Sequence, residues 1–229
     1  MKKLLGSKTP RGITIGSGAA IGMALLILGP LPIQAGSGAT TTAQQTQMAV
    51  LAGGCFWSVE HALEKLPGVT SVRVGYSGGK LENPSYEDVS TEQTGHQESV
   101  EVRFDPKKIS YATLLRNYLR NTDVLDGTGQ FTDRGDSYRP VIFTNSAAQK
   151  FEAEASIKAA AIELRKPASA LGVKIEKLKK FWPAESYHQN YADRNPIKYN
   201  SFRWGSGRDQ RLNQLWGNLA RSGKPWLTK

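Results

Sequence analysis

From Met48 onward, the chain alternates segments whose apolar residues recur at every second position with segments whose apolar residues recur at helical spacing. The clearest strand covers residues 100–104, where apolar residues alternate with Glu101 and Arg103. The clearest helix begins at Cys55, carries apolar residues at i, i+3, i+4 and i+7, and is ended by a Pro-Gly pair. This alternation predicts a domain in which helices pack against a sheet.

The remaining elements follow the same alternation. Further strands are predicted over 69–76, 139–143 and 173–178, and further helices from Ser110, from Ser146 to about Lys166, and over 208–220. Segments that lack either period are predicted to be irregular, and they are 81–96, 123–137 and the aromatic stretch 181–199. We therefore expect an α/β (α+β) fold, a two-layer sandwich with a mixed or antiparallel sheet packed against helices. It should have a ferredoxin-like core and a long irregular C-terminal segment.

The first 39 residues have the layout of a secretory signal peptide. Four basic residues precede an apolar stretch over 13–28, and prolines and the small residues Ser37-Gly38-Ala39 follow. We predict a signal peptide over 1–39, a polar lead-in over 40–47 and one globular domain over 48–229, exported to the periplasm. The alternative is an uncleaved N-terminal membrane anchor.

The net charge gives little reason to expect a nucleic-acid partner. It is +10 for the whole chain and falls to +6 without residues 1–39, which contain four Lys and Arg and no acidic residue. The remaining basic residues are spread along the chain without a nucleic-acid-binding motif around them. We expect a monomer that binds no nucleic acid.

Cys55 is the only cysteine, so the chain cannot form an internal disulfide. Two glycines precede it and Phe56-Trp57 follow it, which suits a nucleophile at the start of a helix beside an apolar pocket. The positive end of a helix lowers a thiol pKa, so we expect a reactive thiolate. The alternative is a buried cysteine that acts as a small hydrophobe. The three histidines share no ligand spacing with Cys55, so no metal is expected.

Glu98 is the second candidate. If the strand over 100–104 extends back by one step, Glu98 lies on the same face as its apolar residues. A carboxyl group held on a buried face is pushed toward its protonated form, which suits a general acid. The alternative is a strand that starts at Ser99 and leaves Glu98 in an exposed loop.

Five motifs together resemble the type A peptide methionine-S-sulfoxide reductases. They are Gly53-Gly54-Cys55-Phe56-Trp57, Gly75-Tyr76-Ser77-Gly78-Gly79, the loop from Asn83-Pro84 through Tyr86 to Gly95-His96-Gln97-Glu98, the run from Asp133 to Arg139, and Glu185-Ser186-Tyr187-His188-Gln189. The resemblance implies reduction of methionine-S-sulfoxide, protein-bound or free, and so repair of oxidised proteins. Cys55 would attack the sulfoxide sulfur and become a sulfenic acid, and Glu98 would protonate the oxygen.

The resemblance also assigns the rest of the site. Tyr86 and Tyr138 would donate hydrogen bonds to the oxygen, and Asp133 would help to hold substrate or water. Phe56 and Trp57 would form the pocket for the S-methyl group, with His188 supporting this substrate-binding part. No bound cofactor is implied.

One departure from the family pattern concerns the return to the thiol. Many relatives resolve the sulfenic acid with a second cysteine, whereas this chain has Thr132 and Ser206 at the positions where some relatives place one. Ser58 also stands where a glycine is common. We expect an external thiol, a thioredoxin-like protein or a small thiol, to attack Cys55 directly.

Two other functions remain open at this point. Cys55 could serve a cysteine hydrolase with His96 or His188 as its base. Alternatively, the chain could be a non-catalytic module that binds oxidised peptides or an envelope partner through the aromatic segment 181–199.

Overall fold

The computed structural model describes residues 46–227. The signal peptide predicted over 1–39 lies outside these residues, as does most of the predicted lead-in. Among the helices of the described part, none has both the length and the apolar character that a membrane span requires.

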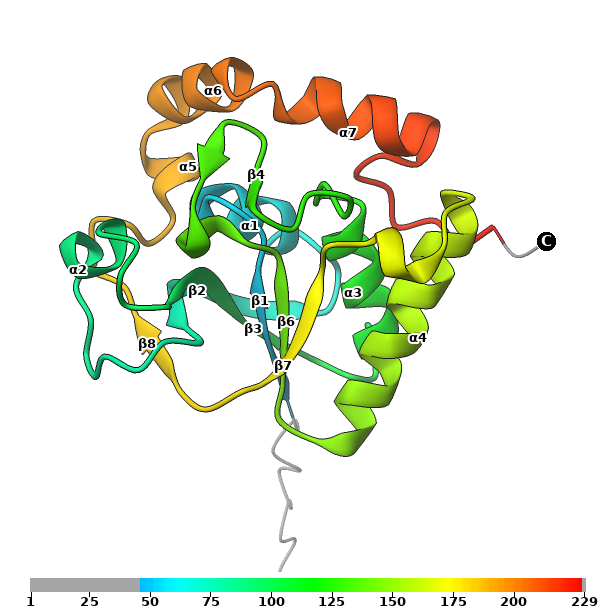
Figure 1. The fold of residues 1–229 in the computed structure, drawn as a ribbon, viewed down its shortest axis with the longest axis horizontal. Helices are drawn as coiled ribbons and strands as arrows, with labels where there is room; N and C mark the ends of the chain where they lie inside the picture. Colours follow the sequence, from blue (N-terminus) through cyan, green and yellow to red (C-terminus); the bar gives the residue numbers. More distant parts are fainter. Residues whose placement is uncertain (1–45, 228–229) are drawn as a thin grey trace, which may run out of the picture. The chain divides into compact units, whose positions relative to one another are not determined.

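Within residues 46–227, a six-stranded mixed sheet forms the centre of the structure (Figure 1). Its strands, in spatial order, are β7 (Lys174–Lys177), β6 (Val141–Thr144), β1 (Gln47–Ala52), β3 (Gln97–Phe104), β2 (Val69–Ser77) and β8 (Phe181–Pro183). The four inner strands pair antiparallel, and β3 lies between the parallel strands β1 and β2. This split βαβ arrangement is that of a ferredoxin-like core, as predicted. The parallel pairing of β7 with β6 makes the sheet mixed.

Three helices cover one face of the sheet: α1 (Phe56–Leu63), α3 (Tyr111–Leu119) and α4 (Ala147–Glu163). Ser110 and Ser146 cap α3 and α4 through their side-chain oxygens, as their positions predicted. The main core lies in this layer, where Val100, Val102 and Phe104 of β3 are fully buried. The opposite face carries a smaller cluster of Val50, Ala52, Val141 and Phe143.

A short link covers that smaller cluster and joins the two edges of the sheet. Residues 178–180 connect β7 to β8, and four Cα steps reach at most about 14 Å. Five strand spacings in a flat sheet would be about 24 Å, so the sheet must curl to bring its edges together. The N–H of Leu178 donates to Thr144 of β6 (2.8 Å), and Ser77 Oγ of β2 donates to the Lys180 carbonyl (3.0 Å). These two hydrogen bonds therefore hold the link to both sides of the sheet and stabilise its curvature.

Two of the segments predicted to be irregular contain short elements. Residues 81–96 include α2 (Tyr86–Ser90), which Ser85 and Asp88 cap reciprocally. Residues 123–137 include the hairpin of β4 (Gly129–Gln130) and β5 (Asp133–Arg134), and 3-10 turns occur at Asp136–Tyr138, Ala168–Ala170 and Gly217–Leu219. Elements of two to five residues are too short to show a period, which is why the sequence did not reveal them.

The prediction of an irregular stretch over 181–199 was wrong in part. After β8, the chain forms α5 (Tyr191–Arg194) and α6 (Pro196–Gly205), and α7 (Arg208–Trp216) covers most of the helix predicted over 208–220. Pro196 occupies the first turn of α6, where its missing N–H costs nothing and its fixed φ suits a helix. These helices lie together at one end of the sheet (Figure 1).

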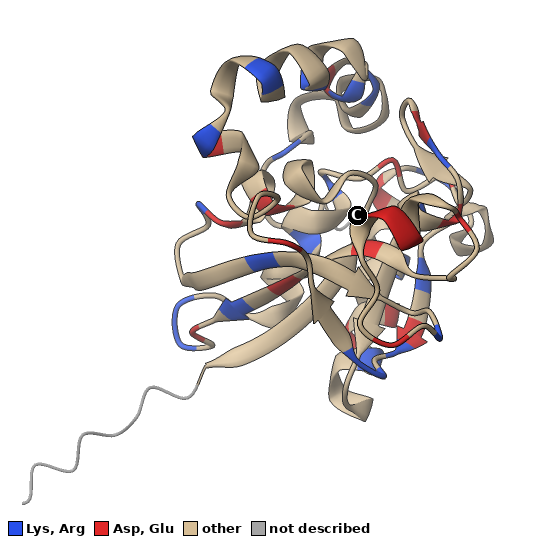
Figure 2. Ribbon diagram, turned by 90° about the vertical axis from the view of Figure 1, so that its left-hand side faces the viewer, with Lys and Arg blue, Asp and Glu red and all other residues tan. Residues whose placement is uncertain are grey.

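Basic and acidic residues are interspersed along the ribbon (Figure 2). Many pair at the surface, such as Lys150 with Glu154 at 3.5 Å. Exposed pairs of this kind contribute little free energy, so the fold depends mainly on its buried core.

Candidate active site

Cys55 lies where β1 leaves the sheet and α1 begins. It is the N-cap residue of α1, and its carbonyl accepts the N–H groups of Ser58 (3.0 Å) and Val59 (3.4 Å). The turn before it depends on Gly54, whose φ is +79° and where a Cβ would lie 2.5 Å from the Cβ of Gln130. The prediction that Cys55 opens a helix is confirmed.

A small pocket of about 80 Å³ surrounds the thiol. Its lining residues are Cys55, Phe56, Trp57, Tyr86, Glu98, Asp133, Tyr138 and Phe202. The structure thus brings together every predicted site residue except His188, and it adds Phe202 of α6. A larger hollow of about 460 Å³ lies between β6, β7 and the start of α4, but none of the predicted site residues lines it.

Glu98 lies on β3 with its side chain on the helix-covered face. The strand begins at Gln97, so the alternative of an exposed loop residue was wrong. Glu98 is 4% exposed and its Oε2 accepts the N–H of Phe56 at 2.9 Å. Burial raises the pKa of this carboxyl to about 8, and the carboxylates of Asp133 and Glu92 add to the rise while the Phe56 N–H opposes it. Glu98 is therefore mainly protonated at pH 7.

The Cys55 thiol has a pKa well above its ordinary value, contrary to the prediction from its helix position. Burial is the largest cause, and the carboxylates of Glu98 and Asp133 raise the pKa further. The cation of Arg208 and the N–H of Trp57 lower it, so the helix start does favour the thiolate, but burial outweighs this. Protonation of Glu98 removes the negative charge that disfavours the Cys55 thiolate. The protonation states of the two groups are therefore coupled.

Two tyrosine hydroxyls and one more carboxyl complete the polar lining. Burial, aided by Glu98, raises the pKa of both Tyr86 and Tyr138, so these hydroxyls stay protonated and can donate hydrogen bonds. Burial also raises the pKa of Asp133, although the cation of Arg208 and a hydrogen bond from the backbone N–H of Cys55 lower it. Its Oδ2 atom is buried and has no hydrogen-bond partner, so it can still accept a bond inside the pocket.

The apolar wall of the pocket is built from aromatic rings. Trp57 stacks on Tyr191 of α5 with 3.8 Å between ring centroids, and Phe202 meets it edge-on at 6.1 Å. His188 lies behind this wall, where its Nδ1 accepts the Trp57 Nε1–H at 3.2 Å. Burial lowers the pKa of His188, which keeps the ring neutral and its Nδ1 free to accept. His188 therefore supports the wall without lining the pocket.

Two residues near His188 hold the pocket to strand β2, and the sequence analysis placed them in a family motif without giving them a role. Glu185 accepts the backbone N–H of Tyr86 (2.8 Å) and the hydroxyl of Tyr76 (2.9 Å). Gln189 bonds both the N–H and the carbonyl of Val74. The signal in the sequence was the motif that runs from Glu185 to Gln189, which does not say what these two side chains bind.

The histidines give Cys55 no base within residues 46–227. In His96, Nδ1 accepts the Gly79 N–H at 3.2 Å and Nε2 lies 2.8 Å from the Leu81 carbonyl. His188 is committed to Trp57, and neither ring lines the pocket. The geometry therefore does not support the cysteine-hydrolase alternative.

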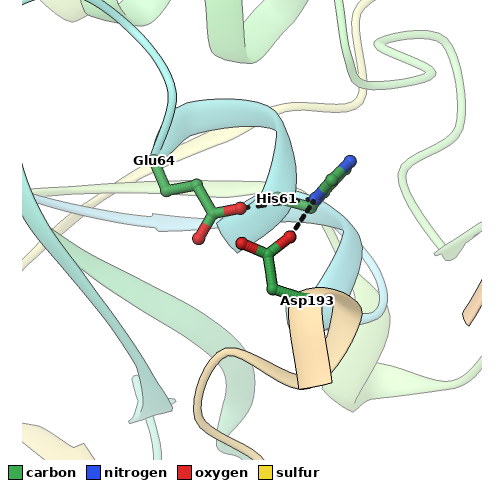
Figure 3. Close-up of side chains that lie close together, drawn as sticks. All are labelled: His61, Glu64 and Asp193. Carbon is green, nitrogen blue, oxygen red and sulfur yellow. Dashed lines mark ion pairs between the residues drawn. The ribbon is translucent and has the colours of Figure 1, made fainter. Parts of the chain in front are cut away.

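A separate cluster joins α1 to α5 (Figure 3). His61 Nδ1 lies 3.3 Å from Glu64 and 3.8 Å from Asp193. The three atoms that could bind a metal ion all lie within 4.8 Å of one another. Lys65 already supplies a cation here, with its Nζ 3.1 Å from Asp193. None of these residues lines the Cys55 pocket, and we assign no metal to them.

Comparisons with known proteins agree on one family. The family model described as peptide methionine sulfoxide reductase matches residues 47–220. The chain is similar to peptide methionine sulfoxide reductase MsrA 2 of Caulobacter vibrioides, with 44% identity over 193 residues that cover 84% of this chain and 97% of that protein. It is 45% identical over 177 residues to MsrA/MsrB of Vibrio cholerae, which covers 77% of this chain but only 47% of that longer relative.

A solved structure shows a similar fold. Methionine sulfoxide reductase A of Corynebacterium diphtheriae is 30% identical, with a TM-score of 0.62 over 66% of this chain and 76% of that one.

Proposed function

Because the chain belongs to the peptide methionine sulfoxide reductase family, we propose that it reduces methionine-S-sulfoxide, protein-bound or free, to methionine and so repairs oxidised proteins. One observation carries the proposal: a single pocket holds the only thiol of the chain and a carboxyl whose pKa is about 8. A sulfoxide sulfur is a poor electrophile until its oxygen is protonated, so a nucleophile and a neutral acid are the two groups that the reaction needs.

The reaction moves one oxygen atom from methionine sulfoxide to the sulfur of Cys55. The Cys55 sulfur attacks the sulfoxide sulfur while Glu98 gives a proton to its oxygen. The oxygen then passes to the Cys55 sulfur: an S–O bond forms on Cys55 while the S–S bond of the adduct and the S–O bond of the sulfoxide break, and methionine leaves, reduced by two electrons. The proton lost by the thiol restores Glu98, so thiol and sulfoxide become sulfenic acid and methionine without a net change in protons.

The other lining residues have roles in binding. The protonated hydroxyls of Tyr86 and Tyr138 donate hydrogen bonds to the sulfoxide oxygen, and the free Oδ2 of Asp133 holds substrate or water. The rings of Phe56 and Trp57, joined by that of Phe202, pack against the S-methyl group.

The size of the pocket bears on the substrate. Its volume of about 80 Å³ is far below the roughly 300–1,000 Å³ of pockets that enclose whole small molecules. It therefore takes the end of a side chain and leaves the rest of a peptide outside, which suits oxidised methionine in proteins and peptides.

The second half-reaction needs an external thiol because the chain has no second cysteine. A thiol RSH attacks the sulfenic acid, releases water and forms a mixed disulfide with Cys55. A second thiol then attacks this disulfide, which restores Cys55 and releases RSSR. A thioredoxin-like protein or a small thiol can supply both equivalents. All the pocket residues come from one chain, so a monomer is sufficient.

The proposal includes export to the periplasm, based on the charged and apolar pattern of residues 1–39. Cell fractionation with intact-mass measurement tests it. A periplasmic protein that lacks about 39 residues supports export, whereas a full-length protein in the membrane fraction indicates an uncleaved anchor.

The activity is tested by single-turnover reduction of the separate S and R epimers of a methionine sulfoxide peptide. We expect about one methionine per enzyme from the S epimer alone, with Cys55 gaining one oxygen by mass. No methionine from either epimer, from a folded protein whose Cys55 is unmodified, would reject the proposal.

A further inference from the structure

Two arginine side chains are almost fully buried, and they differ in how their charge is met. Arg120 is 0% exposed and forms an ion pair with Glu163 at 2.8 Å. Arg208 is 2% exposed, and none of the carboxylates in residues 46–227 forms an ion pair with it. A buried charge without a counter-ion is costly, so its position calls for a reason.

Arg208 reaches only neutral acceptors. Its Nη1 donates to the Asn121 carbonyl at 3.0 Å and its Nη2 donates to the Gly53 carbonyl at 3.4 Å. Its Nε atom is buried and has no partner. The guanidinium also lies over the ring of Phe131, with its carbon 4.2 Å from the ring centroid. Hydrogen bonding is therefore incomplete, and the positive charge has no close ion pair, although the carboxylate of Asp133 acts on it from beyond ion-pair distance.

The guanidinium packs against the turn that carries the nucleophile. Gly53 and Gly54 immediately precede Cys55, and a Cβ at Gly54 would lie 3.2 Å from Nη2 of Arg208. The absence of a side chain at this position allows the cation to approach the backbone next to Cys55. Arg208 is the first residue of α7, so this helix brings the charge to the turn before Cys55 from a distant part of the sequence.

The other groups around the thiol do not favour a negative sulfur. The ionisable groups that face it are Glu98 of β3, Asp133 of β5, Tyr86 of α2, Tyr138 of the 3-10 turn and Arg208 of α7. The carboxylates raise the pKa of Cys55, whereas Arg208 is the one charged side chain among them that lowers it. Burial lowers the pKa of Arg208 to about 10, and the negative charge of Cys55 opposes this decrease.

We propose that Arg208 is the counter-charge of Cys55, a positioning residue whose buried, unpaired guanidinium stabilises the thiolate that attacks the sulfoxide. The use of that thiolate rests on the proposed function. The alternative is a purely structural role, in which Arg208 only joins α7 to the carbonyls of Gly53 and Asn121 by hydrogen bonds. In that case its hydrogen bonds matter and its charge does not.

Substitutions separate the two roles. Arg208→Gln keeps a donor for the Gly53 carbonyl and loses the charge, whereas Arg208→Lys keeps the charge and loses the two-armed geometry. Arg211→Met is the matched control, since it removes a cation from the same helix that pairs with Asp123 at 2.6 Å and does not line the pocket.

The measurement is the pH profile of Cys55 alkylation by iodoacetamide on the full-length protein, followed by intact mass. Cys55 is the only cysteine, so one mass shift reports one site. We expect Arg208→Gln to react about tenfold more slowly at pH 8, which corresponds to a pKa about one unit higher. Arg208→Lys should stay near the native profile, and Arg211→Met should coincide with it.

A folded Arg208→Gln protein with the native profile overturns the proposal, and so does an Arg208→Lys protein that is as slow as Arg208→Gln. If Arg208→Gln does not fold, Arg208→Met replaces it, because an apolar side chain of similar length tolerates burial. Alkylation needs no sulfoxide. If the native protein reduces no sulfoxide, the proposed function is rejected, but the effect of Arg208 on the pKa of Cys55 can still be measured.

Discussion

Replacing Glu98 by glutamine removes the acid of the pocket and keeps an oxygen that can accept the Phe56 N–H. With a pKa of about 8, Glu98 is about nine-tenths protonated at pH 7, so the native protein begins each turnover with the proton in place. A positioned acid contributes roughly 10²- to 10⁴-fold to a rate. We expect Glu98→Gln to slow single-turnover reduction of the S epimer by that factor. The native rate should decline above pH 8, and the variant should lose this decline.

The same substitution has a consequence for stability whose sign follows from the pKa. Burial raises the pKa of Glu98 from 4.5 to about 8, so between these values the folded state holds a proton that the unfolded state has lost. The free energy of unfolding therefore falls as pH rises, by about 1.4 kcal/mol per pH unit and about 5 kcal/mol in all. Urea unfolding of Glu98→Gln should show a slope between pH 5 and 8 that is less negative by about this amount.

Glu101→Gln is the control, since Glu101 lies on the same strand, faces the other side and pairs with Arg73 at 2.8 Å. It should leave single turnover unchanged. A Glu98→Gln protein that reduces the S epimer at the native rate would refute the acid role of Glu98. A variant with the native pH slope would refute the raised pKa.

Other substitutions test the site and the fold. Tyr138→Phe should slow single turnover ten- to a hundredfold, because a hydrogen bond to developing charge is worth roughly 1.5–3 kcal/mol; an unchanged rate removes this hydroxyl from oxygen binding. Gly54→Ala places a Cβ 2.5 Å from that of Gln130 at a φ of +79°. It should cost about 2 kcal/mol or more in urea unfolding, and a native midpoint contradicts the strain. Arg120→Met leaves buried Glu163 unpaired and should cost about 3–5 kcal/mol. A loss below about 1 kcal/mol would show that solvent reaches this carboxylate.

The placements of Cys55 and Glu98 could be predicted because each depends on a local pattern. Cys55 begins a helix because glycines precede it and a helical period follows it. Glu98 faces the core because strand residues two apart share a face, and the apolar residues of β3 fix which face is buried. Neither inference needed to know which other segment lies nearby.

The pKa of the thiol could not be predicted in the same way. The sequence shows the helix start beside Cys55, but burial and the carboxylates of Glu98 and Asp133, 43 and 78 positions later, decide the direction of the shift. Phe202 and Arg208 were missed for the same reason. Phe202 lines the pocket from α6, and Arg208 reaches the turn before Cys55 from α7. The positions of these helices follow from packing, such as the edge-on contact of Phe202 with Trp57. Asn195-Pro196 could have marked the start of a helix, but not what that helix touches.

The two edges of the sheet also matter for what the protein meets. Exposed sheet edges offer unpaired backbone groups to any extended chain, and oxidised proteins that have partly unfolded present such chains. Here one edge is β7, with four residues that include Lys174 and Lys177, and the other is β8, with three residues that end in Pro183. Short strands, lysines and proline all discourage further strand addition. Edges of this kind limit strand addition by any partly unfolded protein that the proposed reaction would bring to the pocket.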